Sequence, residues 1–394
     1  MMFSKRTNWL LQPNELTKVY RARREQGLPI LDLTESNPTQ CSFQYDAHQI
    51  LNALGDSRAL IYEPDPRGLL SARRAVAEYY AERGVHLDPR QIFLTASTSE
   101  AYSFTFRLLA DAGDSLLVPR PSYPLFDFLT RLNDLELIDY PLVYDGHWQI
   151  DRAALLSRIT PRTRALLVVH PNNPTGSFIS PEETNLLIAC CQEHSLALIA
   201  DEVFSDYAHG STPGFQQYSF AQEARVLTFT LSGLSKISAL PQMKCAWVVV
   251  NGPEALRREG LDRMEVIADT FLSLSAPVAC ALPQLLEIRH QMQPQILRRI
   301  NSNREYLDSQ IGSYSEVCRL KTEGGWYAIL RVPAIHSDEE WALRLLQEDG
   351  VLVHPGHFYD FSSEGYLVVS LLPTPEIFAE GVRKLLARIA SDSR

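Results

Sequence analysis

The sequence predicts an α/β fold with three layers, in which helices cover both faces of a mostly parallel β-sheet, followed by a smaller α+β domain. Two observations favour this fold. Short, continuously apolar runs alternate with helical patterns between about residues 90 and 250, and parallel strands that are buried on both faces have this composition. Beyond about residue 260 the pattern changes to long helices and short strands, as in a separate α+β unit.

The elements of the sheet alternate along the chain. We expect helices at 99–112 and 181–193, the second beginning with Pro181, a residue favoured in the first turn of a helix. The apolar runs that we expect to form strands are 91–95, 115–119, 135–138, 165–170, 196–200, 226–230 and 246–250.

After the sheet we expect two long helices, at about 262–288 and 294–312. We therefore divide the chain into a large ligand-binding domain, 46–288, and a small C-terminal domain, 289–394. Residues 1–45 have no fold of their own, and we expect this arm to pack on the small domain or on a partner subunit. The expected elements of the small domain are strands at 326–330, 351–353 and 366–370, a helix near 338–348 and a final helix from Pro375.

The composition is that of an ordinary globular protein, with 394 residues, 45% hydrophobic and 21% charged. The formal net charge of −10, without a basic block, gives no support for binding to nucleic acid or to an acidic membrane surface. No apolar run is long enough to span a bilayer, and residues 1–8 lack the apolar core of a signal peptide. The six cysteines are scattered without metal-ligand spacing, so we expect reduced thiols, a cytoplasmic protein and no metal.

Polar residues follow several of the expected strands, where an open parallel sheet binds its ligands. After the first strand, Ser97, Thr98 and Ser99 stand at the start of a helix. Free backbone N–H groups and hydroxyls at a helix N-terminus hold phosphate well, although a simple helix cap is the alternative for this stretch. After a later strand, Asn173 lies in a loop made rigid by two prolines and Gly176. The Asn173 amide is suited to an oxygen on a ring, with a plain turn as the alternative.

An acid and a lysine complete the set. Asp201 follows the apolar run 196–200 and must find a partner in so apolar a place. A pyridinium N–H would serve, whereas a helix cap or a structural salt bridge is the alternative. Ser235 and Lys236 follow the apolar run 226–230. A buried lysine is costly unless its charge is removed, and a Schiff base removes it while making the nitrogen reactive. A lysine and an aspartate in these positions are the minimal apparatus for pyridoxal 5′-phosphate, although a lone lysine is usually a surface residue.

The combination resembles the class I/II aminotransferases, a family of fold-type I pyridoxal-phosphate enzymes. The resemblance covers nearly the whole chain and depends on the order and spacing of three segments, Asn173-Pro174-Thr175-Gly176, Asp201-Glu202-Val203 and Ser235-Lys236. It implies a pyridoxal-phosphate-dependent aminotransferase that moves an amino group between a small amino acid or amine and a keto acid. Two alternatives stay open: a lyase or decarboxylase with the same cofactor, and a non-catalytic protein that binds or senses it.

The resemblance also implies a role for each residue of the site. Lys236 forms the Schiff base and serves as general base for the proton on the substrate Cα. Asp201 keeps the pyridine nitrogen protonated, Asn173 bonds the 3′ oxygen of the ring, and Tyr123 covers one ring face. The phosphate is expected on the amides and hydroxyls of the helix start. A tyrosine, Tyr62, is expected to reach the phosphate of the neighbouring subunit across the interface of a homodimer with shared active sites.

The sequence departs from the family at two positions beside the cofactor. Phe204 stands where the family usually has a tyrosine whose phenol bonds the 3′ oxygen, and the loss of this donor predicts a raised pKa of the Schiff base. Lys244 stands eight residues after Lys236, where the family usually has an arginine that binds phosphate. Lysine keeps the charge and loses the bidentate geometry, so we expect phosphate binding to survive in weakened form. Ser235 is also expected to contact the cofactor.

A third departure concerns the substrate. The family carries an arginine two residues before a serine in its C-terminal strand, and this arginine binds the substrate α-carboxylate. Here Val368 stands two residues before Ser370, and a valine cannot pair with a carboxylate. Three explanations stay open: another cation such as Arg67 has taken over, the amino donor lacks an ordinary α-carboxylate, or the register differs. Other residues expected to line the substrate site are Ser36, Asn37 and Trp326, with a core tryptophan as the alternative for Trp326. His354 and His357 near the same mouth are expected to be structural.

Overall fold

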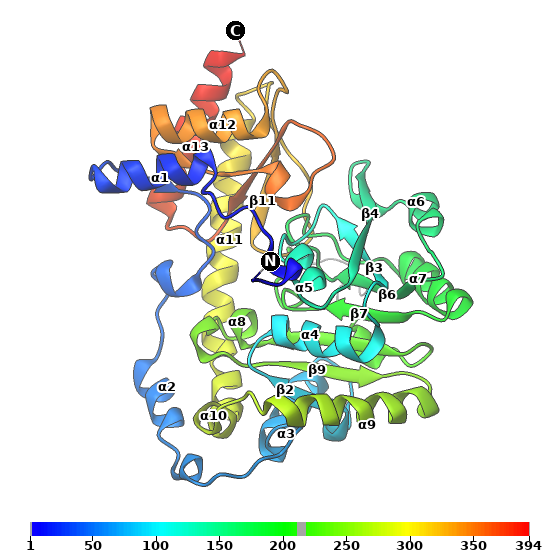
Figure 1. Cartoon of the computed structure of the whole chain (residues 1–394). Helices are drawn as coiled ribbons and strands as arrows, with labels where there is room; N and C mark the ends of the chain where they lie inside the picture. Colours follow the sequence, from blue (N-terminus) through cyan, green and yellow to red (C-terminus); the bar gives the residue numbers. More distant parts are fainter. Residues whose placement is uncertain (1, 211–217, 394) are drawn as a thin grey trace.

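A computed structural model describes residues 2–210 and 218–393 (Figure 1). An eight-stranded sheet forms the centre of its larger part, with the strand order β2-β9-β8-β7-β6-β3-β4-β5. All of these strands run in one direction except β9 and the edge strand β5. The strands are β2 (Ile92–Thr95), β3 (Ser115–Arg120), β4 (Glu136–Tyr144), β5 (Trp148–Ile150), β6 (Thr163–Val169), β7 (Ala197–Asp201), β8 (Thr228–Gly233) and β9 (Ala246–Asn251).

Helices cover both faces of this sheet, which confirms the predicted three-layer α/β/α architecture. Alternate residues along a strand point to opposite faces, and the hydrophobic core divides in the same way. On one face, Phe93 and Leu167 pack with the helices α4 (Thr98–Leu109), α5 (Phe126–Leu132) and α9 (Glu254–Phe271). On the other face, Leu94 and Leu166 belong to the core of α3 (Leu70–Ala81), α7 (Pro181–His194) and α10 (Ala276–Glu287).

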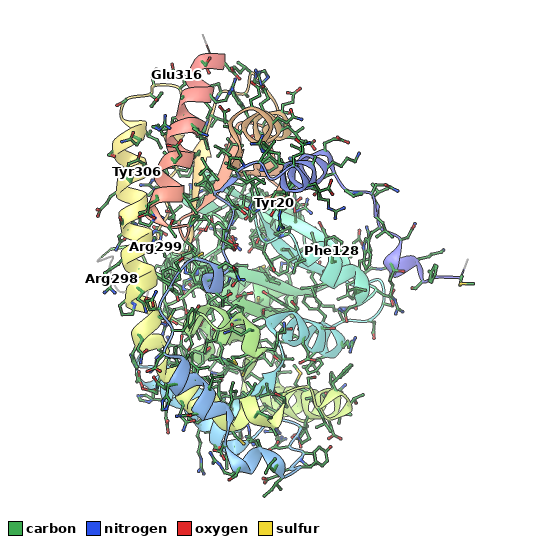
Figure 2. All side chains as sticks on the ribbon, turned by 90° about the vertical axis from the view of Figure 1, so that its left-hand side faces the viewer. Tyr20, Phe128, Arg298, Arg299, Tyr306 and Glu316 are labelled. Atoms are coloured by element: carbon green, nitrogen blue, oxygen red, sulfur yellow. The ribbon has the colours of Figure 1, made fainter. Side chains whose placement is uncertain are left out.

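The smaller part is built on a four-stranded antiparallel sheet with the order β10-β11-β14-β13. The long helix α11 (Arg289–Ile311) leads into it and packs on the final helix, α13 (Pro375–Asp392). Figure 2 shows α11 along one side of the molecule, with Tyr306 farther toward the small domain than Arg298 and Arg299. The expected boundary at residue 288 falls between α10 and α11. The remaining elements are β10 (Cys318–Arg319), β11 (Tyr327–Arg331), α12 (Asp338–Arg344), β12 (Val351–Leu352), β13 (His354–Pro355) and β14 (Tyr366–Ser370).

The N-terminal arm contacts both parts of the chain. The helix α1 (Glu15–Glu25) packs against α12, and β1 (Leu31–Asp32) pairs with β12. Ahead of them, the Trp9 ring lies 5.5 Å from the ring of Phe128 on α5, and Arg6 Nε donates to Asp134 at 2.6 Å. Figure 2 shows Tyr20 on α1 and Phe128 on α5. The arm therefore connects a helix of the large sheet to the small domain.

One expected helix proves to be two helices. The sequence predicts a single helix at about 262–288, but α9 ends at Phe271 and α10 begins at Ala276, so this prediction is wrong. Leu272 has a left-handed backbone conformation, with a φ of +47°, which ends α9. Pro277 then lies in the first turn of α10, because its fixed φ and missing N–H suit a helix start better than a helix interior.

The structure also bears on membrane insertion and on the cysteines. Across residues 2–210 and 218–393, no helix combines the length and apolar character needed to cross a membrane. All six cysteines are unpaired, and five of them are buried.

Candidate active site

The expected site residues gather at the carboxyl ends of neighbouring strands. Asp201 is the last residue of β7, and Lys236 lies in the single-turn helix α8 (Leu234–Ile237) directly after β8, the neighbour of β7. Asn173 follows β6, the neighbour of β7 on its other side, and Thr98 begins α4 shortly after β2. Because these four strands run in the same direction, the residues that follow them meet at one edge of the sheet.

Lys236 has a largely apolar environment. Its Nζ lies 4.5 Å from the centre of the Trp326 ring and 5.2 Å from the centre of the Phe204 ring. Burial lowers the pKa of the Lys236 amine to about 8, and the nearby Asp201 opposes this shift. The hydroxyl of Tyr207 donates to the Lys236 carbonyl oxygen at 2.6 Å and so fixes the backbone of this turn. A lysine with such a pKa carries an appreciable fraction of uncharged amine at neutral pH, and this is the nucleophilic form.

Asp201 is buried near this amine and accepts two hydrogen bonds. The hydroxyl of Tyr102, on α4, donates to Oδ2 at 2.6 Å, and the backbone N–H of Val203 donates to Oδ1 at 3.0 Å. Burial raises the pKa of the Asp201 carboxyl, while both hydrogen bonds and Lys236 lower it. Tyr102 is not among the residues predicted for the site, because in the sequence it is one of several aromatic residues in an amphipathic helix. Its place one turn into the helix of the expected phosphate site is the only sequence signal for it.

Asn173 offers a buried polar atom. Among the described residues, the Oδ1 atom of its side chain has no hydrogen-bond partner. The loop that carries it is tightly held, because Gly176 has a φ of +66° and a Cβ there would collide with the carbonyl oxygen of Gly324. The backbone N–H of Glu323 also donates to the Gly176 carbonyl oxygen at 3.1 Å. Since a buried polar atom without a partner is costly, this amide is suited to a polar group of a ligand.

The start of α4 consists of a cap and two unbound hydroxyls. Ser97 is the N-cap, and its Oγ accepts from the backbone N–H of Glu100 at 3.2 Å. Ser97 therefore caps the helix, which is the alternative to phosphate binding that the sequence leaves open for this stretch. The side chains of Thr98 and Ser99 make no hydrogen bond within the described part of the chain. Together with the first N–H groups of this 12-residue helix, these hydroxyls can hold a phosphate.

Four further residues of the expected cofactor site are more accessible. Burial raises the pKa of the Tyr123 phenol to about 12, with smaller effects from Tyr327 and Asp201, so Tyr123 lies close to both. Tyr62 is 81% exposed, in the segment before α3. Lys244 is exposed and forms no ion pair with any described residue. Ser235, next to the reactive lysine, is half-buried.

The expected substrate residues differ in how close they lie to the site around Lys236. Trp326 is fully buried against Lys236, and Ser36 hydrogen bonds with the phenol of Tyr327 on β11. Asn37 is exposed, and its Oδ1 accepts from the backbone N–H of Thr39 at 3.1 Å, so it caps a short turn.

Arg67 is already paired within the large domain. Its Nε donates to Glu265 at 2.7 Å, its Nη1 donates to the Arg90 carbonyl oxygen at 2.6 Å, and its guanidinium lies 5.2 Å from the centre of the Phe93 ring. The donors of Arg67 are thus taken up by the acid and the backbone, so Arg67 would have to give up these contacts to bind a substrate carboxylate.

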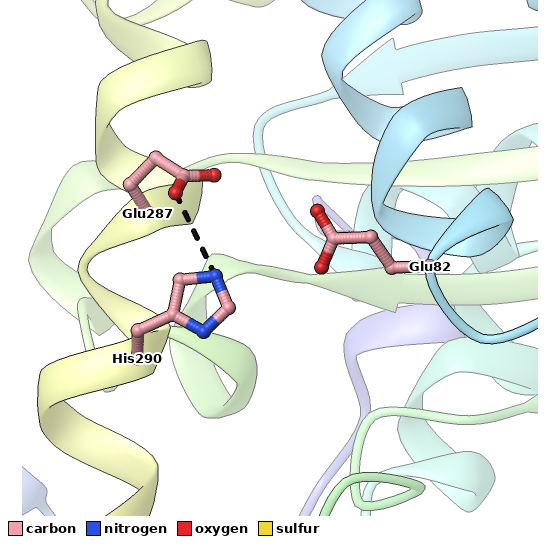
Figure 3. A group of neighbouring side chains, drawn as sticks. All are labelled: Glu82, Glu287 and His290. Atoms are coloured by element: carbon pink, nitrogen blue, oxygen red, sulfur yellow. Dashed lines mark ion pairs between the residues drawn. The ribbon is translucent and has the colours of Figure 1, made fainter.

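A separate group of ionisable side chains lies outside this site (Figure 3). Glu82 after α3, Glu287 at the end of α10 and His290 on α11 have ligand atoms within 4.8 Å of one another. Both carboxylates pair with Arg289, at 2.5 Å and 3.2 Å. Because the guanidinium of Arg289 is buried, it accounts for the convergence of the two acids without a metal ion.

Together these groups fit pyridoxal 5′-phosphate. The buried amine of Lys236 suits its aldehyde, and the buried carboxylate of Asp201 suits its pyridine nitrogen. The Asn173 amide suits the oxygen on the ring, to which its Nδ2 would donate, whereas the unpartnered Oδ1 can only accept. The start of α4, with Thr98 and Ser99, suits the phosphate.

Comparison with known proteins points to one family. The family model described as aminotransferase class I and II matches residues 29–385. The chain is 26% identical to the glutamate-pyruvate aminotransferase AlaA of Haemophilus influenzae over 377 residues, which is 94% of this chain and 93% of that protein. It is 29% identical to the alanine aminotransferase of Mycobacterium tuberculosis over 378 residues, which is 93% of this chain and 87% of that protein. The alanine aminotransferase from Pyrococcus furiosus shares the fold, with a TM-score of 0.87 at 22% identity over 99% of this chain and 100% of that one.

Proposed function

Because the chain belongs to the class I and II aminotransferases, we propose that it moves an amino group from a small amino acid or amine to a carbonyl acceptor such as a keto acid, with Lys236 as the residue that binds the cofactor. Enzymes of this family depend on pyridoxal phosphate, so the chain is a pyridoxal-phosphate-dependent transferase. One observation supports the role of Lys236 above all others. The amine of Lys236, with a pKa lowered to about 8, follows β8, and the buried Asp201 ends the adjacent strand β7.

The residues of the site have complementary tasks. When bound, pyridoxal phosphate supplies an aldehyde that condenses with amines and a ring that accepts an electron pair. Lys236 would bind the aldehyde through Nζ, and its amine, once an amino donor has displaced it, would take the proton from the substrate Cα and return it. Asp201 holds a proton on the pyridine nitrogen, and Tyr102 keeps the Asp201 carboxylate in place through its 2.6 Å hydrogen bond. Asn173 binds the oxygen on the ring.

Other residues would bind the remaining parts of the cofactor. Thr98 and Ser99 would hold the phosphate through hydroxyls and the first N–H groups of α4. The positive charge of Lys244 and the hydroxyl of Ser235 would add to this phosphate site, and Tyr123 would cover the ring.

We also propose that two copies of the chain form a homodimer in the cytoplasm. Leu60, Ile61 and Tyr62 are 89%, 67% and 81% exposed. Ile61 and Tyr62 line a hollow of about 510 Å³ that the segment between α9 and α10 also borders. Consecutive exposed apolar side chains beside such a hollow suit a protein interface. Sedimentation should give a dimer, and Ile61→Asp should give monomers. Leu10→Asp, which changes a 98% exposed leucine elsewhere, should remain dimeric. A wild-type monomer would contradict the proposal.

The catalytic proposal is tested with the purified protein and added cofactor. Borohydride should attach pyridoxal phosphate covalently to the peptide that contains Lys236, and a Lys236→Ala variant should bind the cofactor without this adduct or turnover. Addition of an amino donor should convert the cofactor absorbance stoichiometrically to that of pyridoxamine phosphate. Release of carbon dioxide, or of a keto acid without an acceptor, would instead identify a decarboxylase or lyase. An adduct at another lysine, or turnover in Lys236→Ala, would remove Lys236 from this role.

A further inference from the structure

Val368 lies on the face of the small sheet that meets the active site. In the register of β14 with β11 and β13, it projects to the same face as Tyr327 and His354, because paired residues of antiparallel strands and residues two apart along a strand share a face. The ring of Tyr327 lies 6.4 Å from that of Phe204, whose ring lies 5.2 Å from Lys236 Nζ. The Val368 side chain therefore lies on the sheet face that carries Tyr327 toward the active site, and it is fully buried there.

The polar groups on this surface are uncharged. Tyr327 hydrogen bonds with Ser36 and Tyr359, and the Tyr359 hydroxyl lies 3.1 Å from His354 Nδ1. Burial lowers the pKa of His354 to about 4 and raises the pKa of both phenols. At neutral pH the surface thus presents hydroxyls and a neutral imidazole around an apolar side chain. We name it the small-domain wall, formed by Val368, Tyr327, Tyr359, His354 and Ser36.

The ionised groups that act on the small-domain wall are acids. Glu35 acts electrostatically on Tyr327, and Asp32 acts on His354. Neither acid forms an ion pair within the described residues. In the same part of the chain, no arginine or lysine acts electrostatically on Tyr327, Tyr359 or His354. Lys236 is needed for the amine chemistry itself, and Lys244 is proposed to bind the phosphate. A carboxylate placed against this wall would have no partner for its charge.

Arg299, on α11, could rival this interpretation, but its Nη1 already donates to the carbonyl oxygens of Cys41 and Leu372 at 3.2 Å and 2.9 Å. A second rival is Arg120, just before the Tyr123 loop. Its nitrogens lie 3.5 Å from a carboxylate oxygen of Asp127 and 3.6 Å from one of Asp360. Two acids therefore already balance its charge, and a substrate carboxylate would have to displace them.

We propose that the amino donor is a 2-amino alcohol, an inference that rests on the proposed function. In such a donor a hydroxymethyl group takes the place of the α-carboxylate of an amino acid. A hydroxyl both donates and accepts, so it matches the phenols and the imidazole of the small-domain wall. It also brings no charge toward Val368, Glu35 and Asp32. For L-alaninol the product is hydroxyacetone: the amino group stays on the enzyme's cofactor, and water supplies the oxygen of the new carbonyl.

Matched substrate pairs test this preference. The pairs are L-alaninol with L-alanine, and 2-amino-1,3-propanediol with L-serine, each compared by kcat/KM of the spectroscopic half-reaction. We expect the alcohol of each pair to react at least about 100-fold better, since a desolvated carboxylate without a partner is disfavoured to this extent or more. Val368→Arg should shift the ratio toward the amino acid by about 100-fold. Arg120→Gln should leave the ratio unchanged. A ratio that depends on Arg120, or wild-type alanine turnover equal to that of alaninol, would overturn the inference.

A binding measurement tests the wall without turnover. In protein reduced with borohydride, which cannot react further, calorimetry should show at least about 10-fold tighter binding of propionate to Val368→Arg than to wild type. Equal binding would overturn the inference. If the arginine variant does not fold, the Tyr359→Phe variant tests the inference instead. It should lower kcat/KM for L-alaninol about 10-fold. It should leave kcat/KM for isopropylamine, which has no hydroxyl, unchanged. An equal loss for both amines would overturn the role of Tyr359.

The two proposals fail in different ways. If no member of either pair converts the cofactor, the proposed aminotransferase function is wrong, and propionate binding still decides whether the wall rejects a carboxylate. If the amino acids react as well as the alcohols, the aminotransferase stands and the 2-amino alcohol class is wrong.

Discussion

Lys236 should titrate well below an ordinary lysine. Burial lowers the pKa of its amine from 10.5 to about 8, which corresponds to about 3.4 kcal/mol against the charged form. At pH 7 the uncharged fraction is then about 9%, compared with about 0.03% for an ordinary lysine, a gain of about 300-fold. We therefore expect the reaction of the cofactor-free protein with pyridoxal phosphate, or with an amine-labelling reagent, to accelerate with rising pH around a midpoint near 8.

The neighbouring acid provides a test of direction. Because the charge of Asp201 raises the pKa of Lys236, Asp201→Asn should move the midpoint of labelling below that of the wild type. Asp134→Asn, which changes an acid of the surface pair with Arg6, should leave it in place. Labelling at a series of pH values, followed by mass spectrometry of the peptide that contains Lys236, gives each midpoint. A wild-type midpoint near that of a solvated lysine, or an upward shift in Asp201→Asn, would refute the reasoning.

Three substitutions test other parts of the site. Tyr102→Phe removes the 2.6 Å hydrogen bond to the Asp201 carboxylate and should weaken cofactor binding about 10- to 100-fold in equilibrium dialysis. The control is Tyr140→Phe, which loses a buried hydrogen bond elsewhere in the sheet and should leave cofactor binding unchanged. Burial raises the pKa of Glu202 from 4.5 to about 7. Since this folded-state pKa lies above the unfolded one, stability should fall by up to about 3 kcal/mol as the pH rises through this interval. Glu202→Gln should remove that loss in urea unfolding, and a profile equal to that of the wild type would disprove it. Phe204→Tyr adds a phenol near Lys236 and should lower the pH at which the cofactor absorbance titrates, whereas a titration at higher pH would contradict the argument.

The large domain could be predicted from the sequence because its local signals agree with its fold. Continuous apolar runs mark the buried strands, and Asp201 and Lys236 each follow such a run, so the topology of a parallel sheet brings them together. The partners of these residues could not be found in the same way. Tyr102 and Tyr207 lie among other aromatic residues, and only the three-dimensional arrangement shows that their hydroxyls reach Asp201 and the Lys236 carbonyl oxygen.

Two features that local patterns in the sequence do not reveal have physical causes of the same kind. Arg67 stands in a segment of the sequence that suggests a free cation. The fold, however, places Glu265, from a helix far along the sequence, at 2.7 Å from the Arg67 Nε. The predicted helix at 262–288 continues the helical pattern through Leu272, but the backbone turns left-handed there and restarts near Pro277. In both cases a long-range or backbone feature overrides a local pattern.

The departures at Phe204 and Val368 are connected through Tyr327. The Phe204 ring contacts those of Trp326 and Tyr327 at 5.3 Å and 6.4 Å, and Tyr327 shares its sheet face with Val368. The Trp326 indole N–H is buried without a partner among the described residues. A tyrosine at 204 alone would place a hydroxyl in this apolar contact, and an arginine at 368 alone would place a charge there. Either polar group offers the other a partner, so we expect Phe204→Tyr and Val368→Arg together to destabilise the protein less than the sum of the single changes, by about 0.5–3 kcal/mol. Strict additivity in urea unfolding would show that the two positions do not interact.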